Sequence, residues 1–418
     1  MSDNPVQLER ARDIASRFEI PESLEVSDFA GKGNINQQTY LITAGLAKRR
    51  KQFLLQLINP AVFTQPHAVM NGMISCIRAQ QKALSEGVLA GDEWETIQLV
   101  PTRGGRDYLE LQGEPGKECW RMMARIGNAL AFRSLREIRD QGMRISVAEQ
   151  AGRGLAIFGV LTEGMDVSQI VSPLPGYRDT ELYYNQLHSV MAGARAMSDT
   201  EAYLPCDPVV RESTRQHFIV QLNPVEYRRR LGDPQLRPFI DLAIEQKSFG
   251  LSLVEKLKSG ELRKVVIHGD TKLENFLFSA QTGKVKALVD LDTIMPHTWL
   301  SDWGDMVRSL VNIAGEREKD LGCIEVDQEV FYALAKGYLG VHKTDSRELE
   351  LMVDAPQIMA LELGIRFLAD YLRGDSYFQL RPGDPPDLNK IRAMVQFSVF
   401  ERLRHKADSA RQVLQSFQ

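Results

Sequence analysis

Three polar side chains, Asp270, Asn275 and Asp290, have the types and the spacing that phosphoryl transfer requires. Asp270 follows the short apolar run Val265–Ile267 after a two-residue break, and Asn275 comes five residues after Asp270. In phosphoryl transfer one carboxylate orients the attacking hydroxyl, while an amide oxygen and a second carboxylate hold Mg²⁺ against the phosphates of ATP. The spacing therefore predicts Asp270 as the catalytic base, and Asn275 and Asp290 as metal ligands.

The elements around these residues should bring them to one place. Val265–Ile267 is β-branched and is typical of a buried strand, and residues 276–278 and 285–289 alternate like a hairpin around a glycine-bearing turn. The second strand of this hairpin would deliver Asp290 to the end of the sheet that carries Asp270. A surface hairpin with polar turn residues is the alternative, since Asp and Asn favour turns for local reasons. The combination of strand, bend and hairpin favours the catalytic interpretation.

Two segments carry a resemblance to a known superfamily. HGDTKLENFLF, from His268, and LVDLDTIMPHTWLSDWGDMVRSL, from Leu288, resemble the catalytic region of the aminoglycoside phosphotransferase and choline kinase superfamily, most closely its N-acetylhexosamine 1-kinase group. The resemblance implies an α+β, bilobal, protein-kinase-like fold, in which a small antiparallel β-rich lobe and a large, mainly helical lobe hold ATP between them. We expect the first lobe at residues 1–120 and the second at residues 121–418.

Three more residues of these segments are expected to support the site. His268 belongs to the same motif as Asp270, and Asp292 follows Asp290 as a neighbouring acid or an auxiliary metal ligand. Asp305 is predicted to begin a helix, where the helix dipole favours an acid. The resemblance implies that Asp305 also braces the backbone of the catalytic loop.

The composition limits the class of protein. The chain has 418 residues, of which 43% are hydrophobic and 25% charged, and its formal charge of -4 argues against a nucleic-acid partner. Its four cysteines form no CxxC pair, which fits a reducing compartment. The amino-terminal stretch has no apolar signal-peptide region, and no apolar run reaches membrane-spanning length. We therefore expect a cytoplasmic protein without a membrane partner.

A glycine-bearing loop within residues 26–44 is a candidate cover for the nucleotide. Glycine lets backbone N–H groups approach phosphate oxygens without interference from a Cβ atom. An isolated G-x-G is common in ordinary hairpins. The HGD motif further along the chain makes the interpretation as a nucleotide-covering loop stronger. The sugar 1-kinases have a similar Gly-x-Ile-Asn-x-Thr-Tyr pattern, although this chain has one extra residue before the threonine. The resemblance predicts nucleotide contacts from Gly31, Gly33, Asn34, Asn36 and Thr39.

Gln56 stands where most of the superfamily places a phosphate-binding lysine, on the predicted strand Phe53–Ile58. A carboxamide can donate a hydrogen bond but brings no charge. The sugar 1-kinase group resembles this chain at the position, so Gln56 is predicted to contact the nucleotide. The missing lysine motivates one rival hypothesis, a nucleotide-binding pseudokinase, whereas the intact acidic residues of the catalytic region argue against it.

The acceptor is expected near a long helix, Glu348–Gly374. Its end, RFLADYLRGDSYF, resembles an element of the hexosamine 1-kinases that contacts sugar, which predicts Arg366 and Tyr377 as substrate residues. A solvated pair of Arg366 and Asp370, one turn apart, is the alternative. In the earlier loop PLPGYRDT, Tyr177-Arg178 replaces the Phe-His pair of that group. The change either alters the acceptor pocket or repacks a surface, and we favour the second.

The predicted reaction is ATP- and Mg²⁺-dependent phosphorylation of a small-molecule acceptor. In its narrow form, the nucleophile is the anomeric hydroxyl of an N-acetylhexosamine or a related sugar. An amino-alcohol or an aminoglycoside is the rival acceptor, and such a cation would require a pocket rich in carboxylates or aromatic rings. The sequence makes no prediction of the oligomeric state.

Overall fold

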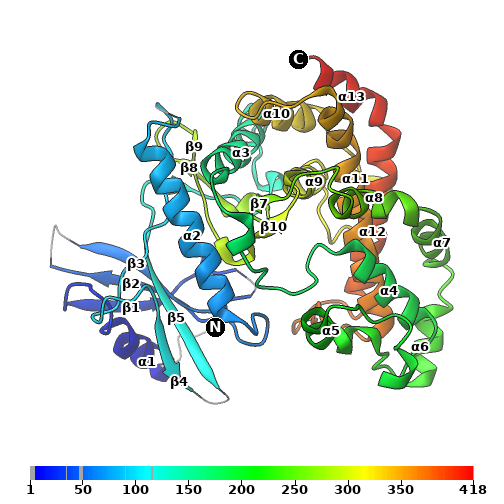
Figure 1. Cartoon of the computed structure of the whole chain (residues 1–418), viewed down its shortest axis with the longest axis horizontal. Coiled ribbons are helices and arrows are strands. Elements are labelled where there is room, and N and C mark those ends of the chain that lie inside the picture. The colour runs from blue at the N-terminus through cyan, green and yellow to red at the C-terminus, as the bar shows by residue number, and fades with distance from the viewer. Residues whose placement is uncertain (1–4, 34, 47–49, 90, 114–115, 418) are drawn as a thin grey trace.

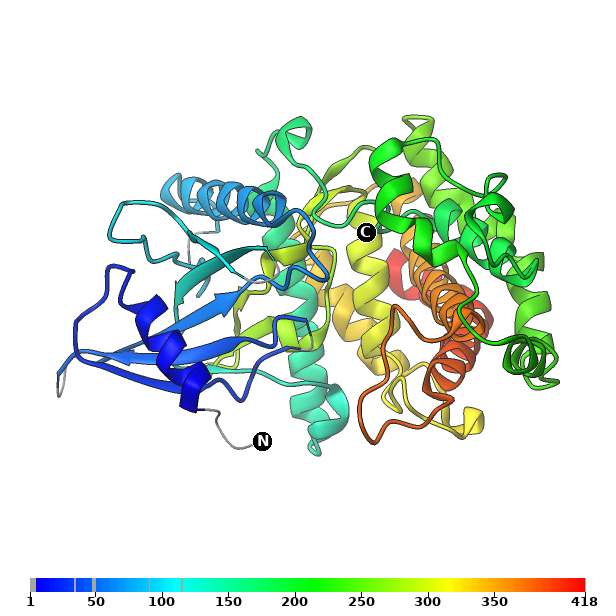
Figure 2. The ribbon, with the colours of Figure 1, turned by 90° about the horizontal axis from the view of Figure 1, so that it is seen from below.

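The computed structural model describes residues 5–33, 35–46, 50–89, 91–113 and 116–417. A small lobe built on an antiparallel sheet lies beside a larger helical lobe (Figures 1 and 2). The predicted α+β, two-lobed architecture is therefore confirmed. In the described part of the chain, no helix is both long enough and apolar enough to cross a membrane.

The small lobe is a five-stranded antiparallel sheet between two helices. Its strands run in the order β1 (Leu24–Asp28), β2 (Thr39–Ala44), β3 (Lys51–Leu57), β5 (Lys117–Ala124) and β4 (Leu109–Gln112). Alternate residues of β3, such as Phe53 and Leu55, are buried in a core shared with α1 (Pro5–Ala15). The opposite face packs towards α2 (Pro66–Ser85), so the sheet separates the two helices (Figure 2). Gln56 lies on this second face.

The two lobes are joined after β5. This strand continues past residue 120 to Ala124, and the next short strand, β6 (Ala129–Leu130), pairs with β8 (Phe276–Ser279) of the large lobe. The boundary expected after residue 120 stays a prediction.

The region predicted to be catalytic forms two small strand pairs between the lobes. β7 (Val265–Ile267) pairs with β10 (Met295–His297), and β8 pairs with β9 (Val285–Leu288). Single 3-10 turns follow β7 and β9, at Leu273–Asn275 (η6) and Leu291–Thr293 (η7). The predicted strand and hairpin are confirmed, with ends that differ by one residue at most. In Figure 1, β7 and β10 lie between the sheet and the helices of the large lobe.

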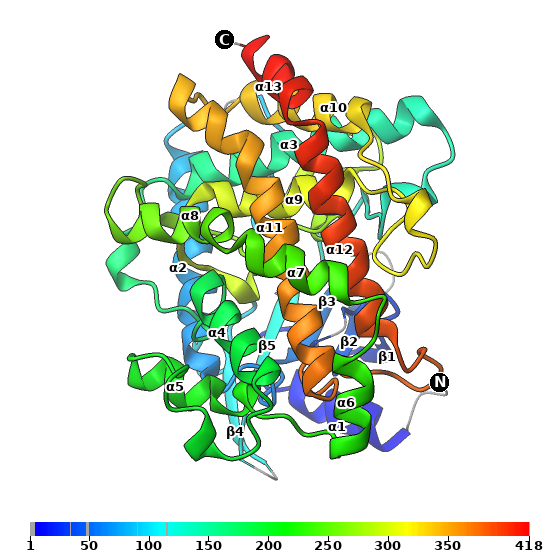
Figure 3. The same cartoon turned by 90° about the vertical axis from the view of Figure 1, so that its right-hand side faces the viewer.

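Long helices form the core of the large lobe. The 28-residue helix α11 packs along α12 and against α9, and α3 packs along α10 (Figures 1 and 3). The helices of the lobe are α3 (Gln141–Thr162), α4 (Thr180–Met191), α5 (Pro208–Thr214), α6 (Pro224–Leu231), α7 (Arg237–Glu245), α8 (Lys247–Lys258), α9 (Trp299–Leu310), α10 (Gln328–Leu339), α11 (Ser346–Arg373), α12 (Leu388–His405) and α13 (Ala407–Gln415). Five 3-10 turns connect them: η2 (Leu135–Glu137), η3 (Val167–Gln169), η4 (Met197–Asp199), η5 (Arg215–Phe218) and η8 (Leu321–Cys323).

The start of α9 differs from the prediction. The helix begins at Trp299, and the hydroxyl of Thr298 caps it by accepting a hydrogen bond from the backbone N–H of Leu300. Asp305 therefore lies in the middle of the helix, so its predicted place in the first turn is wrong.

Candidate active site

Asp302, on α9, holds the backbone of the catalytic loop. Its carboxylate accepts hydrogen bonds from the backbone N–H groups of His268 (2.6 Å) and Gly269 (2.8 Å). The hydroxyl of Thr271 donates to the carbonyl of Asp302 at 2.9 Å. Burial raises the pKa of Asp302, while the two N–H donors act in the opposite direction. The turn that carries Asp270, the predicted catalytic residue, is thus fixed to a helix of the large lobe.

Gly269 is required by the geometry of this turn. Its φ of +84° lies in the left-handed region, and an added Cβ would come within 2.6 Å of the carbonyl oxygen of Thr293. The turn therefore approaches the end of η7 more closely than any side chain would permit.

The prediction that Asp305 braces the backbone of the catalytic loop is wrong, because Asp302 accepts the hydrogen bonds from that backbone. Asp305 pairs instead with Arg178 (2.8 Å) and with Arg308 (2.6 Å). Burial alone would raise the pKa of Asp305, but the two arginines hold it well below its usual range. Asp302 stands three residues earlier in the same motif, and recognising Thr298 as the cap would have placed it in the first turn.

His268 and Asn275 connect Asp270 to the strand that leads to Asp290. Nδ1 of the buried His268 accepts from the backbone N–H of Asp270 (3.3 Å), and Nε2 lies 2.9 Å from the carbonyl oxygen of Val289. Nδ2 of Asn275 donates to the carbonyl oxygen of Asp270 at 2.7 Å. The structure therefore brings these residues together as the spacing predicted, and Oδ1 of Asn275 is the atom that can face a metal.

Asp290 lies among acidic neighbours. Its backbone is in the left-handed region, with φ of +65°. Burial raises the pKa of Asp290, and the charges of Asp292 and Asp270 raise it further. The neighbouring Asp292 is paired with Arg121, whose Nη2 lies 2.5 Å from its Oδ1. Asp270, Asp290 and Asp292 together carry more negative charge than Arg121 and Lys272 offset, which fits a divalent cation.

Asn275 and Asp290 are the residues that would hold Mg²⁺. No group of three or more His, Cys, Asp or Glu side chains among the described residues forms a complete metal site. Two protein ligands are sufficient for this ion, since Mg²⁺ is usually bound by one or two carboxylates together with the phosphates of the substrate.

Lys272 is a functional candidate that the sequence reasoning missed. Its ammonium group lies 2.9 Å from Oδ1 of Asp270, and its side chain is 49% exposed. The charge of Asp270 raises the pKa of Lys272. The sequence could have indicated this residue, because a lysine stands two residues after the predicted catalytic aspartate in HGDTK.

The residues predicted to face the nucleotide form one connected set. Asn36 donates to Oδ2 of Asp292 at 2.6 Å, and its carbonyl oxygen accepts from the hydroxyl of Thr39 at 2.8 Å. That hydroxyl in turn accepts from Nε2 of Gln56 at 3.0 Å. Asn36 thus links the small lobe to Asp292 of the large lobe.

The rest of the glycine-bearing loop lies between β1 and β2. Gly31 and Gly33 have no positive φ, so neither needs to be glycine for its backbone conformation. An added Cβ at Gly33 would meet no atom within 4 Å. The predicted contact Asn34 lies outside the residues that the structure describes.

Arg121 is the second residue that was missed. It lies on β5 directly opposite Gln56 of β3, and one of its nitrogens is 2.5 Å from Oδ1 of Asp292. The sequence held no signal for this position, because a predicted strand does not reveal its cross-strand partners.

Aromatic rings surround Arg366. Its guanidinium lies 4.8 to 5.7 Å from the ring centres of Tyr183, Tyr177, Phe378 and Tyr377. Among the described residues, no carboxylate comes within ion-pair distance of this guanidinium. The predicted substrate residues Arg366 and Tyr377 therefore lie together, with Nη2 of Arg366 3.5 Å from the hydroxyl of Tyr377.

The alternative of a solvated pair between Arg366 and Asp370 is wrong. Asp370 is buried and bonds Arg373, and its carboxylate accepts from the backbone N–H groups of Tyr377 (3.0 Å) and Phe378 (2.8 Å). Asp370 thus shapes the loop that carries Tyr377.

Tyr177 and Arg178 connect the aromatic cluster to the catalytic loop. The hydroxyl of Tyr177 and Nη2 of Arg178 both donate to the carbonyl oxygen of Gly269, at 2.9 and 3.0 Å. Arg178 is only 4% exposed. The expectation that this pair repacks a surface is therefore wrong.

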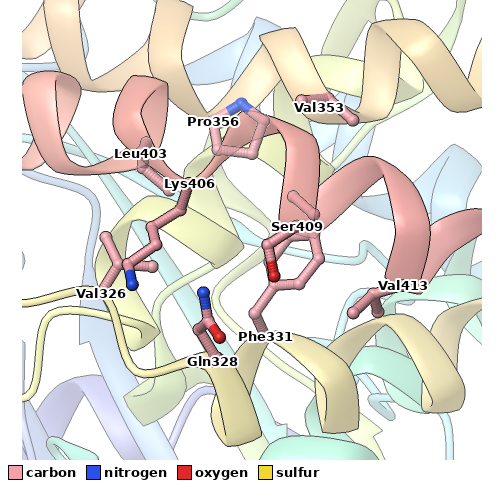
Figure 4. Close-up of a pocket in the computed structure, with 10 residues that line it drawn as sticks. Val326, Gln328, Phe331, Val353, Pro356, Leu403, Lys406, Ser409 and Val413 are labelled. Atoms are coloured by element: carbon pink, nitrogen blue, oxygen red, sulfur yellow. The ribbon is translucent and has the colours of Figure 1, made fainter.

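A separate cavity lies between α10, α11, α12 and α13 (Figure 4). It is lined mainly by apolar side chains, such as Phe331, Val353 and Val413. None of its lining residues belongs to the catalytic loop or bonds to it, so we assign the cavity no part in phosphoryl transfer.

Comparison with known proteins gives the family. The model of the phosphotransferase enzyme family, APH, matches residues 30–339. The chain belongs to this family. It is therefore a phosphotransferase, and the predicted membership of the aminoglycoside phosphotransferase type is confirmed, while the sugar 1-kinase group is not.

Three solved structures are similar to this chain along most of its length. The microcompartment-associated aminopropanol kinase is 15% identical, with a TM-score of 0.55 over 96% of this chain and 98% of the other. A choline/ethanolamine kinase family protein from Mesorhizobium loti is 14% identical, with a TM-score of 0.49 over 98% and 99%. The amicoumacin kinase hAmiN, in complex with AMP-PNP and Ca²⁺, is 13% identical, with a TM-score of 0.49 over 97% and 93%. The first of these supports the protein-kinase-like fold.

Proposed function

We propose that the protein is an ATP- and Mg²⁺-dependent kinase of a small molecule with a hydroxyl acceptor. The observation that carries the proposal is the meeting of Asp270, Asn275 and Asp290 at one loop that is held from behind by Asp302. A carboxylate, an amide and a second carboxylate in this arrangement have few structural reasons to be together.

Each residue then has a defined task. Asp270 accepts or orients the proton of the acceptor hydroxyl, and Asn275 and Asp290 hold Mg²⁺. When bound, Mg²⁺ neutralises the negative charge of the phosphates. Lys272, whose ammonium group contacts Asp270, would stabilise charge on the transferred phosphoryl group. On the nucleotide side we place the loop with Gly31 and Gly33 and the set of Asn36, Thr39 and Gln56.

We further propose a neutral, polyhydroxylated acceptor, namely the anomeric hydroxyl of an N-acetylhexosamine or a related sugar. The aromatic rings expected of a site for a cation are present, but Arg366 supports a neutral acceptor, because its own guanidinium already lies over these rings. A cationic acceptor would be repelled there. Tyr377 is 43% exposed and offers a ring face for the C–H groups of a sugar. The activity is placed in the cytoplasm, where ATP is available.

Phosphate transfer from Mg·ATP to a panel of acceptors tests this proposal. The panel should contain N-acetylhexosamines and other neutral sugars, choline-like and ethanolamine-like amines, and aminoglycosides. We expect transfer to neutral sugars, with the phosphate on the anomeric oxygen as read by ³¹P NMR. Transfer to cationic acceptors alone would overturn the sugar assignment and favour the amino-alcohol alternative. Failure to consume ATP with every acceptor would favour the pseudokinase.

The variant Arg366→Met sharpens the test. Loss of the guanidinium should raise KM for the sugar about tenfold or more, since a hydrogen bond to a charged group contributes roughly 1.5–3 kcal/mol. Arg404→Met is the control, because Arg404 also stacks on a ring, that of Phe400, but bonds Gln246. An unchanged KM in Arg366→Met would remove this residue from the acceptor site.

A further inference from the structure

The small lobe offers the nucleotide little positive charge. Asn36, Thr39 and Gln56 are neutral, and Lys32, on the glycine-bearing loop, is paired with Asp28. The helix behind the sheet, α2, contains no acidic residue that could hold a lysine in place. A nucleoside di- or triphosphate is strongly anionic, so we expect this lobe to provide a positively charged side chain that binds the phosphates.

Arg121 is a cation on the correct face of the sheet. Because it is directly opposite Gln56 in the register of β3 and β5, the two side chains point the same way. Oε1 of Gln56 accepts from Nε (3.0 Å) and Nη2 (2.5 Å) of Arg121. Gln56 therefore fixes the plane of the guanidinium, and Arg121 is only 1% exposed.

The other N–H donors of Arg121 have no strong, well-aligned hydrogen-bond acceptor. Nη1 is directed at the sulfur of Met73, 3.2 Å away, and a thioether is a weak acceptor. Nη2 lies 2.5 Å from Oδ1 of Asp292, yet that oxygen receives no aligned hydrogen bond from any described residue. The carboxylate of Asp292 thus neutralises the charge of the guanidinium, but it is not aligned to accept hydrogen bonds from its N–H groups.

The place of that anion is informative. Asp292 belongs to the large lobe and stands two residues after the proposed metal ligand Asp290. Within the described residues it is the only carboxylate at ion-pair distance from Arg121. A buried ion pair gives little net stability compared with an apolar pair of similar size, so folding alone does not explain these two charges. A guanidinium is well suited to bind phosphate oxygens in a bidentate manner.

We propose that Arg121 is the residue through which the small lobe binds the phosphates of the nucleotide, and that Asp292 occupies its guanidinium while no nucleotide is present. On binding, phosphate oxygens replace the carboxylate, and Gln56 keeps the guanidinium in plane. This inference rests on the proposed function, because it requires a nucleotide between the lobes.

Nucleotide binding without metal provides the test. Calorimetry in EDTA, with ADP and with adenosine, should be compared for the wild-type protein, Arg121→Met and Asp292→Asn. Arg121→Met should weaken ADP binding about tenfold or more and leave adenosine binding unchanged, since only ADP carries phosphates. Asp292→Asn should tighten ADP binding, because the competing anion is gone.

Two further variants keep the test decisive. Arg125→Met is the matched control: Arg125 follows β5, is exposed, and bonds Gln52 of β3, so its loss should leave ADP binding unchanged. Adding Gln56→Lys to Arg121→Met should restore ADP binding by returning a charge to the same face. If Arg121→Met does not fold, as judged by circular dichroism, Asp292→Asn decides the matter.

Three outcomes would overturn the inference. They are ADP binding that is insensitive to Arg121, an equal loss of ADP and adenosine binding in Arg121→Met, and ADP binding to Asp292→Asn that is unchanged or weaker. If the wild-type protein binds no ADP in EDTA but binds Mg·ADP, this inference alone falls, and if it binds neither, the proposed kinase activity falls as well. ADP binding without dependence on Arg121 removes the inference alone.

Discussion

Asp270 is attached to its surroundings mainly through its backbone, whereas its side chain contacts Lys272. The variant Asp270→Asn should therefore keep the loop in place while removing the proton acceptor. We expect kcat to fall roughly 10²–10⁴-fold, the usual contribution of general base catalysis. ADP binding should stay close to that of the wild type. Steady-state kinetics and calorimetry measure the two effects, and near-normal turnover would place the base elsewhere.

Lys272 has two possible effects that act in opposite directions. If its ammonium group only neutralised Asp270, its removal would leave the base more available and would not slow the reaction. If it stabilises charge on the transferred phosphoryl group, Lys272→Met should lower kcat about 10²-fold, as the loss of one preorganised donor does. We expect the second result, with partial activity in Lys272→Arg.

Rate measurements on a matched lysine provide the control for Lys272. Lys336 lies on α10, far along the chain from the catalytic loop, and also pairs with a carboxylate, that of Glu149. Lys336→Met should leave kcat unchanged. Equal rates in Lys272→Met and Lys336→Met would remove Lys272 from the mechanism.

At the level of elements, α9 and the catalytic loop form one unit through Asp302. Asp302→Ala should leave two buried N–H groups without acceptors, which costs roughly 3–5 kcal/mol of unfolding free energy if each loss is about 2 kcal/mol. The loop should then shift, so kcat should fall as well. Denaturant unfolding and steady-state kinetics test both expectations.

A surface carboxylate with the same bonds separates local stability from catalysis. Asp327 caps α10 and accepts from the N–H groups of Glu329 and Val330. Asp327→Ala should lower stability by about 1 kcal/mol, the usual cost of a lost helix cap, without changing kcat. If Asp302→Ala behaved like Asp327→Ala, Asp302 would have no special part in positioning the loop.

The sequence predicts elements well where the pattern is local. The strand Val265–Ile267 and the hairpin after it follow from β-branched residues, alternation and a glycine-bearing turn, and these features place Asp270, Asn275 and Asp290 together. The prediction of a residue's role failed where that role depends on a partner far away in the sequence. Asp302 and Asp305 are both acids on α9, and only their packing shows which one faces the loop.

Cross-strand neighbours show the same limitation. The strand that carries Gln56 was predicted from its apolar residues, but the register that places Arg121 opposite it arises from the pairing of β3 with β5. These strands are separated along the chain by α2 and β4. Long-range register is set by the whole sheet, so the charge next to Gln56 was not predictable from the residues around it.

For the whole molecule, a network of paired charges, buried at Arg178 and Asp305, joins the catalytic loop to the helices behind it. Arg178 bonds the carbonyl oxygen of Gly269 and pairs with Glu362 of α11 and Asp305 of α9. The network continues from Asp305 through Arg308 and Glu316 to Arg392 of α12. Several helices of the large lobe are therefore connected to the active site by paired charges, so we expect their packing to depend on pH.

Glu316 makes this dependence measurable. Burial would raise its pKa, but Arg392 and Arg308 lower it to about 2, from an ordinary value of 4.5. A carboxylate whose pKa is lower in the folded state stabilises the fold above its unfolded pKa, and this stabilisation is lost as the pH falls towards the folded pKa. Glu316→Gln should therefore have a lower Tm than the wild type at pH 7, and the difference should shrink between about pH 4.5 and pH 2. Thermal unfolding of both proteins across this range tests the prediction, with Glu401→Gln, an exposed acid on α12, as the control. A difference in Tm that stays constant down to pH 2 would mean that packing, and not the charge of Glu316, holds these helices together.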